Sequence, residues 1–180
     1  MRRISYNEAE SLARRVGSRD PFDAFDYLNV KLKWSDHHPA DGLKGFATIV
    51  LRQKYVVLNS SLNRTEAMIV AAHELGHIKL HANSVGIFHF VDFDLCHDTD
   101  LQENEASLFG ADFLISDEDV LELIQYDENC NFYNVAARLY VPVPFFSYKV
   151  LSMISRGYRL NLPEGIDSHF LRKPLHGNKS

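Results

Sequence analysis

Hydrophobic and polar residues recur along the chain with two different periods. Apolar residues at every third or fourth position predict four helices, over residues 6–16, 64–80, 101–114 and 118–126. Alternation or short apolar runs predict three strands, over residues 30–34, 45–51 and 55–58, with the polar residues 52–54 as a turn. Three shorter helices are expected over residues 22–28, 135–140 and 144–154.

The beginning of the longest helix carries its own signal. Asn63 is a good N-cap, and Glu66 stands three residues later as in a capping box. Strands followed by helices predict an α+β fold, with a small mixed or antiparallel sheet packed on the helix over 64–80. The aromatic and acidic stretch 82–100 is expected to be a hairpin or an excursion between two helices. Three of its rings, at Phe88, Phe90 and Phe93, are expected either in the core or along the wall of a peptide groove.

Composition narrows the class of protein. Hydrophobic residues make up 46% and charged residues 24% of 180 residues, which is ordinary for a folded domain and excludes wholesale disorder. The longest apolar runs have six residues and are too short to cross a bilayer. The first eight residues turn acidic where an export signal needs an apolar stretch, and two cysteines cannot form a disulfide framework. We therefore expect a cytoplasmic protein without a membrane partner.

Charge is spread unevenly along the chain. Residues 1–130 carry 12 Lys and Arg against 22 Asp and Glu, a balance of −10, whereas residues 131–180 carry 7 against 2, a balance of +5. The basic segment is expected either to pack against the acidic body or to contact an acidic partner or nucleic acid. No dense basic stripe accompanies it, which disfavours nucleic-acid binding.

One motif in the helix over 64–80 points to chemistry. His73, Glu74 and His77 form the pattern H-E-x-x-H. Four residues place both histidines on one helix face, one turn apart, where two neutral imidazoles can share one Zn²⁺. Glu74 is rotated about 100° from His73, so that it flanks the metal and can act as a general base on a zinc-bound water. Chance occurrence of two histidines on a helix is the alternative.

A catalytic zinc needs a third protein ligand, which the helix over 101–114 can supply. Glu105 shares a face with apolar residues and is preferred over Glu103, which is expected to point more toward solvent. Asp112 is expected either in a surface salt bridge or in a hydrogen bond to a ligating histidine. His81 continues the stripe but lies too far along a straight helix to bind the same ion, so packing or support of a ligand is expected.

Two motifs together resemble the ImmA/IrrE (DUF955) metallopeptidase family. The stretch His73–His81 resembles the core of that family, and Glu105–Ala111 resembles its second motif. The resemblance implies a zincin-like fold and a gluzincin-like zinc endopeptidase, with His73, His77 and Glu105 on one Zn²⁺ and Glu74 as general base. Family members of this size are often encoded by phages or mobile elements and act as anti-repressors that cleave a helix-turn-helix repressor. A repressor of that type is therefore the expected protein substrate.

Three parts are expected along the chain: a metallopeptidase domain over 1–116, a helical subdomain over 117–157 and an irregular tail over 158–180. The helices around residues 135–154 resemble a helix-turn-helix, but the second helix is mostly apolar, which disfavours DNA binding. A metal-bound regulatory protein without turnover, which binds a transcription regulator or DNA, is the competing hypothesis.

Overall fold

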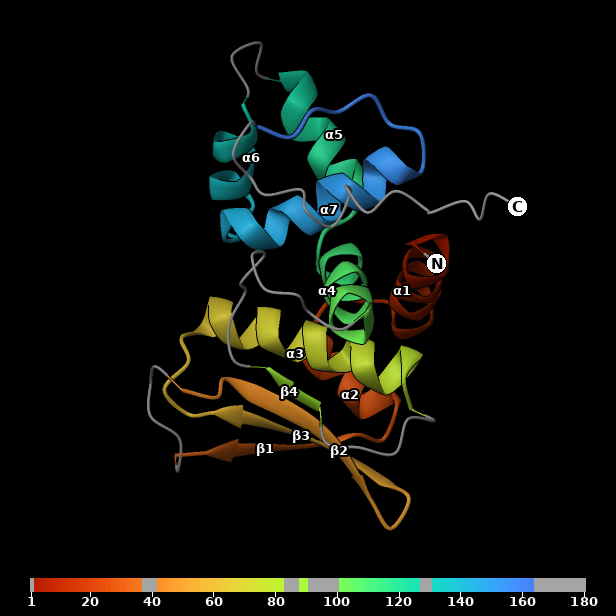
Figure 1. Cartoon of the computed structure of the whole chain (residues 1–180), viewed down its shortest axis with the longest axis vertical. Coiled ribbons are helices and arrows are strands. Elements are labelled where there is room, and N and C mark those ends of the chain that lie inside the picture. The colour runs from red at the N-terminus through yellow and green to blue at the C-terminus, as the bar shows by residue number, and fades with distance from the viewer. Residues whose placement is uncertain (1, 37–41, 83–87, 91–100, 127–130, 164–180) are drawn as a thin grey trace, which may run out of the picture.

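The computed structural model describes residues 2–36, 42–82, 88–90, 101–126 and 131–163 (Figure 1). Seven helices and four strands lie within these residues. They are α1 (Arg2–Val16), α2 (Pro21–Tyr27), β1 (Lys31–Ser35), β2 (Gly45–Val50), β3 (Gln53–Asn59), α3 (Arg64–Leu80), β4 (Phe88–Phe90), α4 (Leu101–Leu114), α5 (Asp117–Tyr126), α6 (Phe132–Arg138) and α7 (Val143–Ser155). Among the described helices, none combines the length and apolar character that crossing a bilayer requires. The predicted α+β class is confirmed.

The sheet is mixed, with the strand order β1-β3-β2-β4. β1 runs parallel to β3, while β2 is antiparallel to both β3 and β4. Val50 pairs with Gln53 across the β2–β3 hairpin, so its turn consists of Leu51 and Arg52. The turn expected at residues 52–54 is therefore two residues long and begins one residue earlier. Of the excursion expected at 82–100, the structure describes residue 82 and strand β4; Phe93 and the side chains of residues 88–90 lie outside the description.

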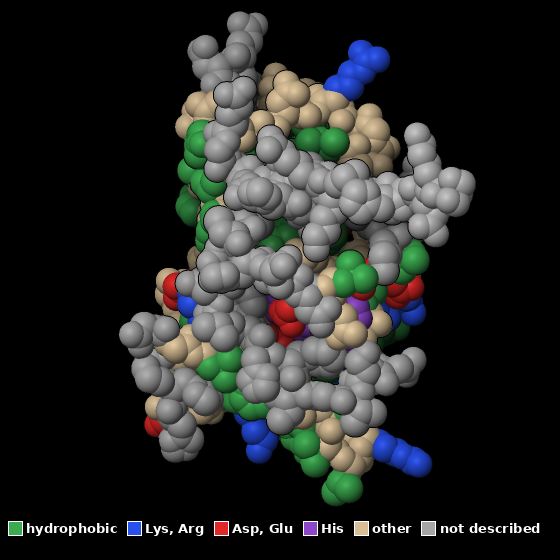
Figure 2. All heavy atoms as spheres, viewed as in Figure 1, with side chains coloured by type: hydrophobic (Ala, Val, Ile, Leu, Met, Phe, Trp, Pro, Cys, Tyr) green, Lys and Arg blue, Asp and Glu red, His purple; other side chains and the backbone are tan. Residues whose placement is uncertain are grey.

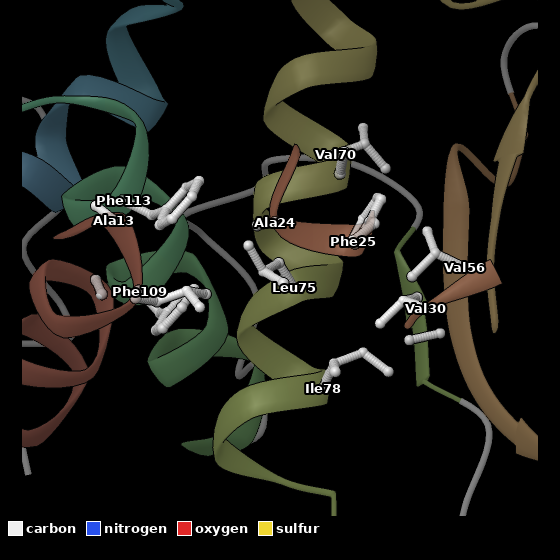
Figure 3. Close-up of a cluster of buried hydrophobic side chains, with 14 of the residues drawn as sticks. Ala13, Ala24, Phe25, Val30, Val56, Val70, Leu75, Ile78, Phe109 and Phe113 are labelled. Carbon is white, nitrogen blue, oxygen red and sulfur yellow. The ribbon is translucent and has the colours of Figure 1, made fainter. Parts of the chain in front are cut away.

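Helix α3 crosses one face of the sheet and forms the centre of the first hydrophobic core (Figures 1 and 3). Ala47, Val56 and Leu58 alternate along their strands and belong to the same buried cluster as Val70 and Leu75 of α3. The buried strand residues, which recur at every second position, thus pack against the apolar residues of helix α3.

The capping box predicted for α3 is confirmed. Asn63 Oδ1 accepts a hydrogen bond from the backbone N–H of Glu66 at 3.0 Å, and Glu66 Oε2 accepts one from the backbone N–H of Asn63 at 3.1 Å. Two backbone donors at the helix N-terminus are thereby satisfied, so the helix begins at Arg64.

Helices α3 and α4 pack unusually close together because glycines lie at their crossing. A Cβ atom added to Gly76 would lie 2.8 Å from both Cα and O of Ala106, and one added to Gly110 would lie 3.1 Å from the backbone of Ala72 and His73. This close packing fixes how α4 meets the histidine-bearing turn of α3.

A second hydrophobic core joins α3 and α4 to the C-terminal helices. Ile69 of α3 and Leu108 of α4 pack there with Val120 of α5 and Phe145 of α7. The helices around residues 135–154 are present as α6 and α7, but residues 145–153 of α7 are all buried, which leaves that stretch no open face for a DNA groove. Residues 158–163 are irregular, and the division of the chain at 116 and 157 stays a prediction.

Asp112 lies in a buried ion cluster rather than at the surface or beside a ligating histidine. Lys149 Nζ lies 3.0 Å from Asp112 Oδ1 and 2.7 Å from Asp117 Oδ1, and Ser152 Oγ donates a hydrogen bond of 2.6 Å to Asp112 Oδ2. Arg156 forms a two-pronged pair with Asp117. These contacts replace both expectations for Asp112 and tie α4 to the start of α5 and to α7.

Candidate metal centre

Two imidazoles meet on one face of α3. His73 and His77 are buried, and their Nε2 atoms lie 3.1 Å apart. Their ring centroids are separated by 4.8 Å. The one-turn spacing of the motif therefore places two ring nitrogens at a common point, as the sequence predicts.

A carboxylate from α4 completes the group. Glu103 Oε2 lies 3.2 Å from His73 Nε2, and Glu103 Oε1 lies 3.4 Å from His77 Nε2. Glu105, the ligand expected from the sequence, instead has Oε2 3.7 Å from His81 Nε2. The geometry thus replaces Glu105 by Glu103 as the acidic partner of the two histidines.

Apolar periodicity predicted Glu105 instead of Glu103 because α4 is buried on nearly every side. All residues from 106 to 113 are buried, so apolar periodicity does not identify the face that meets α3. Leu101, an apolar residue that shares a helix face with Glu105, is 48% exposed. Two residues turn a helix by about 200°, which separates Glu103 from Glu105. The signal that identifies the correct face is the small-residue spacing of Ser107 and Gly110, four and seven residues after Glu103.

The three side chains fit a tetrahedral metal ion. Their ligand atoms lie within 4.8 Å of one another. Ligands about 2.1 Å from a tetrahedral ion are separated by roughly 3.4 Å, close to the three distances observed. Burial lowers the pKa of His73 to about 4, so its imidazole is neutral near pH 7. Burial pushes the pKa of Glu103 upward, but hydrogen bonds from His73 and His77 outweigh it and lower the pKa to about 2. Two imidazoles and one carboxylate are a donor set that suits zinc.

Glu74 lies fully buried one residue along α3 from His73. Burial, reinforced by the negative charge of Glu103, raises its pKa well above the ordinary value, against an opposing effect of the Ala47 backbone. Neither carboxylate oxygen makes a hydrogen bond of normal geometry to the part of the chain that the structure describes. A buried carboxylate without hydrogen-bond partners raises the free energy of the folded state, which favours a ligand, a water or a cation beside it. In Figure 2, acidic and histidine side chains gather near the middle of the visible face.

Comparison with known proteins agrees with this geometry. Residues 26–151 match peptidase family M78, described as the IrrE N-terminal-like domain. The chain belongs to the ImmA/IrrE family. It is also 32% identical, over 111 residues, to a protein named uncharacterized immunity region protein 2 of Bacillus phage phi105. The match covers 60% of this chain and 66% of the length of that relative. Membership of the ImmA/IrrE family indicates a metallopeptidase.

Two more side chains lie beside the candidate metal centre of this ImmA/IrrE family member: Ser107 of α4 and His81, which follows the end of α3. Ser107 Oγ lies 3.2 Å from His73 Nδ1, and both side chains are buried. A hydrogen bond from Nδ1–H to Ser107 leaves the Nε2 lone pair directed at the common point. His81 Nε2 lies 3.2 Å from the carbonyl oxygen of Gln102, which ties the end of α3 to the start of α4. Sequence reasoning expected a supporting role for His81 as one alternative and gave no role to Ser107.

Proposed function

We propose that this chain is a zinc-dependent endopeptidase of zincin-like fold and gluzincin-like chemistry. His73, His77 and Glu103 would hold one Zn²⁺, and Glu74 would serve as general base. The convergence of three ligand atoms within 4.8 Å beside a buried glutamate carries this proposal. An ion pair of the same residues without a metal would leave the buried Glu74 carboxylate unexplained.

The bound zinc would supply Lewis acidity, by polarising the scissile carbonyl and lowering the pKa of a bound water. Glu74 would hold that water, take its proton as the hydroxide attacks, and deliver the proton to the leaving amine. Burial raises the pKa of Glu74 above its ordinary value, which makes its carboxylate a stronger base toward that water. Strand β4 lies at the edge of the sheet beside α3, where an extended substrate segment would add as a further strand.

The proposed substrate is a helix-turn-helix transcriptional repressor, cleaved in the cytoplasm by an anti-repressor of phage or mobile-element type. The name of the phage phi105 relative, an immunity region protein, supports a link to repressor-controlled genes. Cleavage of one specific repressor peptide bond would relieve repression without any contact between this chain and DNA. The buried α7 supports a protein substrate over a DNA-binding role for that helix.

The test compares metal content and cleavage across four proteins. Wild-type chain purified without chelator is expected to carry one zinc, measured by elemental mass spectrometry, and to cleave a helix-turn-helix repressor from the same genome. Glu74→Gln is expected to keep the zinc and lose cleavage. Glu103→Gln is expected to lose zinc, while the matched Glu105→Gln keeps it. Wild type without zinc refutes the proposal, and full biological function of Glu74→Gln would point to a metal-bound regulator without turnover.

A further inference from the structure

The tip of the β2–β3 hairpin, residues 49–52, exposes three consecutive apolar side chains. Ile49, Val50 and Leu51 are 40%, 51% and 96% exposed. Figure 1 shows this hairpin extending from the sheet beyond the helices that cover it. Single exposed apolar residues are ordinary on a protein surface, but a projecting cluster of them is typical of a binding site.

The backbone of the hairpin tip is also strained. Leu51 and Arg52 have φ angles of 49° and 67°, in the left-handed region. Asn and Gly are preferred at both positions of such a two-residue turn. The left-handed conformation brings Cβ close to the following carbonyl oxygen; Gly has no Cβ, and the short polar side chain of Asn can form compensating local hydrogen bonds. The fold gains almost no packing from Leu51 in return, since nearly all of it faces solvent. Leu51 also adjoins two further exposed apolar residues, Ile49 and Val50, and such a cluster at a disfavoured turn is better explained by an external contact than by folding.

The hairpin tip is held at its base by side-chain hydrogen bonds. Gln53 Nε2 donates hydrogen bonds to the carbonyl oxygens of Asn29 at 2.8 Å and Lys54 at 3.1 Å, which fixes the base of the turn. Ile49 and Val50 are consecutive in a strand, so their side chains project from opposite faces. Ile49 lies opposite Lys54 on one face and Val50 lies opposite Gln53 on the other, so each face of the tip carries an exposed apolar side chain beside a polar one. A narrow tip of this kind fits a pocket better than a flat surface.

The charge of the residues around the hairpin tip indicates the charge of the surface that would bind it. Residues 45–59 contain two basic residues, Arg52 and Lys54, and no acidic one, although residues 1–130 as a whole have a balance of −10. We propose that the hairpin tip docks into an apolar pocket with an acidic rim on the protein substrate, away from the scissile bond. This rests on the proposed peptidase function and assigns part of its substrate recognition to Leu51 and Arg52.

A membrane surface is the other class of ligand for an apolar tip with basic neighbours. The net charge of the chain opposes it, because an anionic leaflet repels a protein of net charge −5 and only two basic residues accompany the tip. Three apolar side chains on a rigid turn also bury far less than an amphipathic helix would. The observations therefore favour a protein pocket.

The experiment measures binding of the purified helix-turn-helix repressor that serves as substrate in the cleavage test above. Both compared proteins carry Glu74→Gln, so that the repressor stays intact. Adding Leu51→Asn is expected to weaken binding at least fivefold, while the melting temperature is unchanged or higher because Asn tolerates the left-handed conformation. Tyr140→Asn is the matched control: Tyr140 is 82% exposed with a φ of 56°, in the turn between α6 and α7, and its replacement is expected to leave binding unchanged.

Three results would overturn the docking proposal. One is a loss of less than fivefold on Leu51→Asn, and another is no binding by the Glu74→Gln parent. The third is Leu51-dependent sedimentation of that parent with vesicles of phosphatidylserine and phosphatidylcholine. Leu51-dependent binding without cleavage by wild type would refute the peptidase and keep the docking surface. Cleavage by wild type, together with binding that does not depend on Leu51, would refute the docking surface and keep the peptidase.

Discussion

Replacing Gly76 by alanine tests whether the crossing of α3 and α4 sets the geometry of the metal site. The added Cβ would lie 2.8 Å from Cα and O of Ala106, whereas relaxed contacts between heavy atoms begin near about 3.5 Å. Both contacting atoms belong to backbone, so no side chain can rotate away. Helix α4 must therefore retreat by roughly 0.7 Å, and Glu103, one turn before Ala106, moves with it.

Two opposing effects decide the magnitude of the change in stability. Alanine in place of a mid-helix glycine contributes about 1 kcal/mol of helix propensity. Overpacking against a rigid neighbour costs about 3 kcal/mol, at the upper end of the usual range, because backbone is on the other side. The net expectation is a loss of about 2 kcal/mol, which lowers the melting temperature of a chain of this length by roughly 4–8 °C.

The assay is thermal unfolding of Gly76→Ala and wild type, each with and without zinc. The difference between the two proteins is expected to grow when zinc is present, because the retreat of Glu103 weakens zinc binding. Gly110→Ala is the control, since its Cβ would lie 3.1–3.2 Å from backbone atoms of Ala72 and His73 and should perturb the crossing less. A Gly76→Ala protein as stable as wild type, with unchanged zinc affinity, would refute the reasoning.

Three further predictions concern the support of the site and of α4. Ser107→Ala is expected to lower zinc affinity about 10–100-fold in chelator competition without loss of fold, because His73 loses the partner of its Nδ1; unchanged affinity would exclude that role. Lys149→Met is expected to destabilise the protein by about 3–5 kcal/mol in urea unfolding, because it leaves buried Asp112 and Asp117 short of positive charge. Burial pushes the pKa of Asp117 upward, but hydrogen bonds from its two basic partners outweigh it and hold the pKa below the ordinary range. Its stabilisation is thus complete above the unfolded pKa of about 3.9 and declines as the pH falls below it, so Asp117→Asn should flatten the acid limb of the stability curve.

The sequence predicts this fold best where local chemistry decides the outcome. The capping box of Asn63 and Glu66 sets the start of α3, and the H-E-x-x-H spacing sets the meeting of two imidazoles, because both depend on residues within one or two turns. The β2–β3 turn was harder to place because Leu51 and Arg52 lack the usual residue types of a left-handed turn.

The choice between Glu103 and Glu105 could not be made from apolar periodicity. That pattern distinguishes a buried face from a solvent face, but α4 is enclosed by several neighbours and has several buried faces. The face that meets α3 is defined by how closely two backbones approach, and small residues such as Gly110 permit that approach. The same limit explains Asp112, whose partner Lys149 is far away in sequence and follows no local pattern.

Helix α4 connects the candidate site to the rest of the molecule through three of its faces. Glu103 and Ser107 contact the histidines of α3, and Phe109 packs in the first core. Leu108 packs in the second core with α5, α6 and α7, and Asp112 joins the buried ion cluster there. The position of Glu103 therefore depends on α5, α6 and α7 as well as on α3. A change in the C-terminal helices that shifts α4 should therefore alter affinity for the proposed metal, although it touches none of the three proposed ligands.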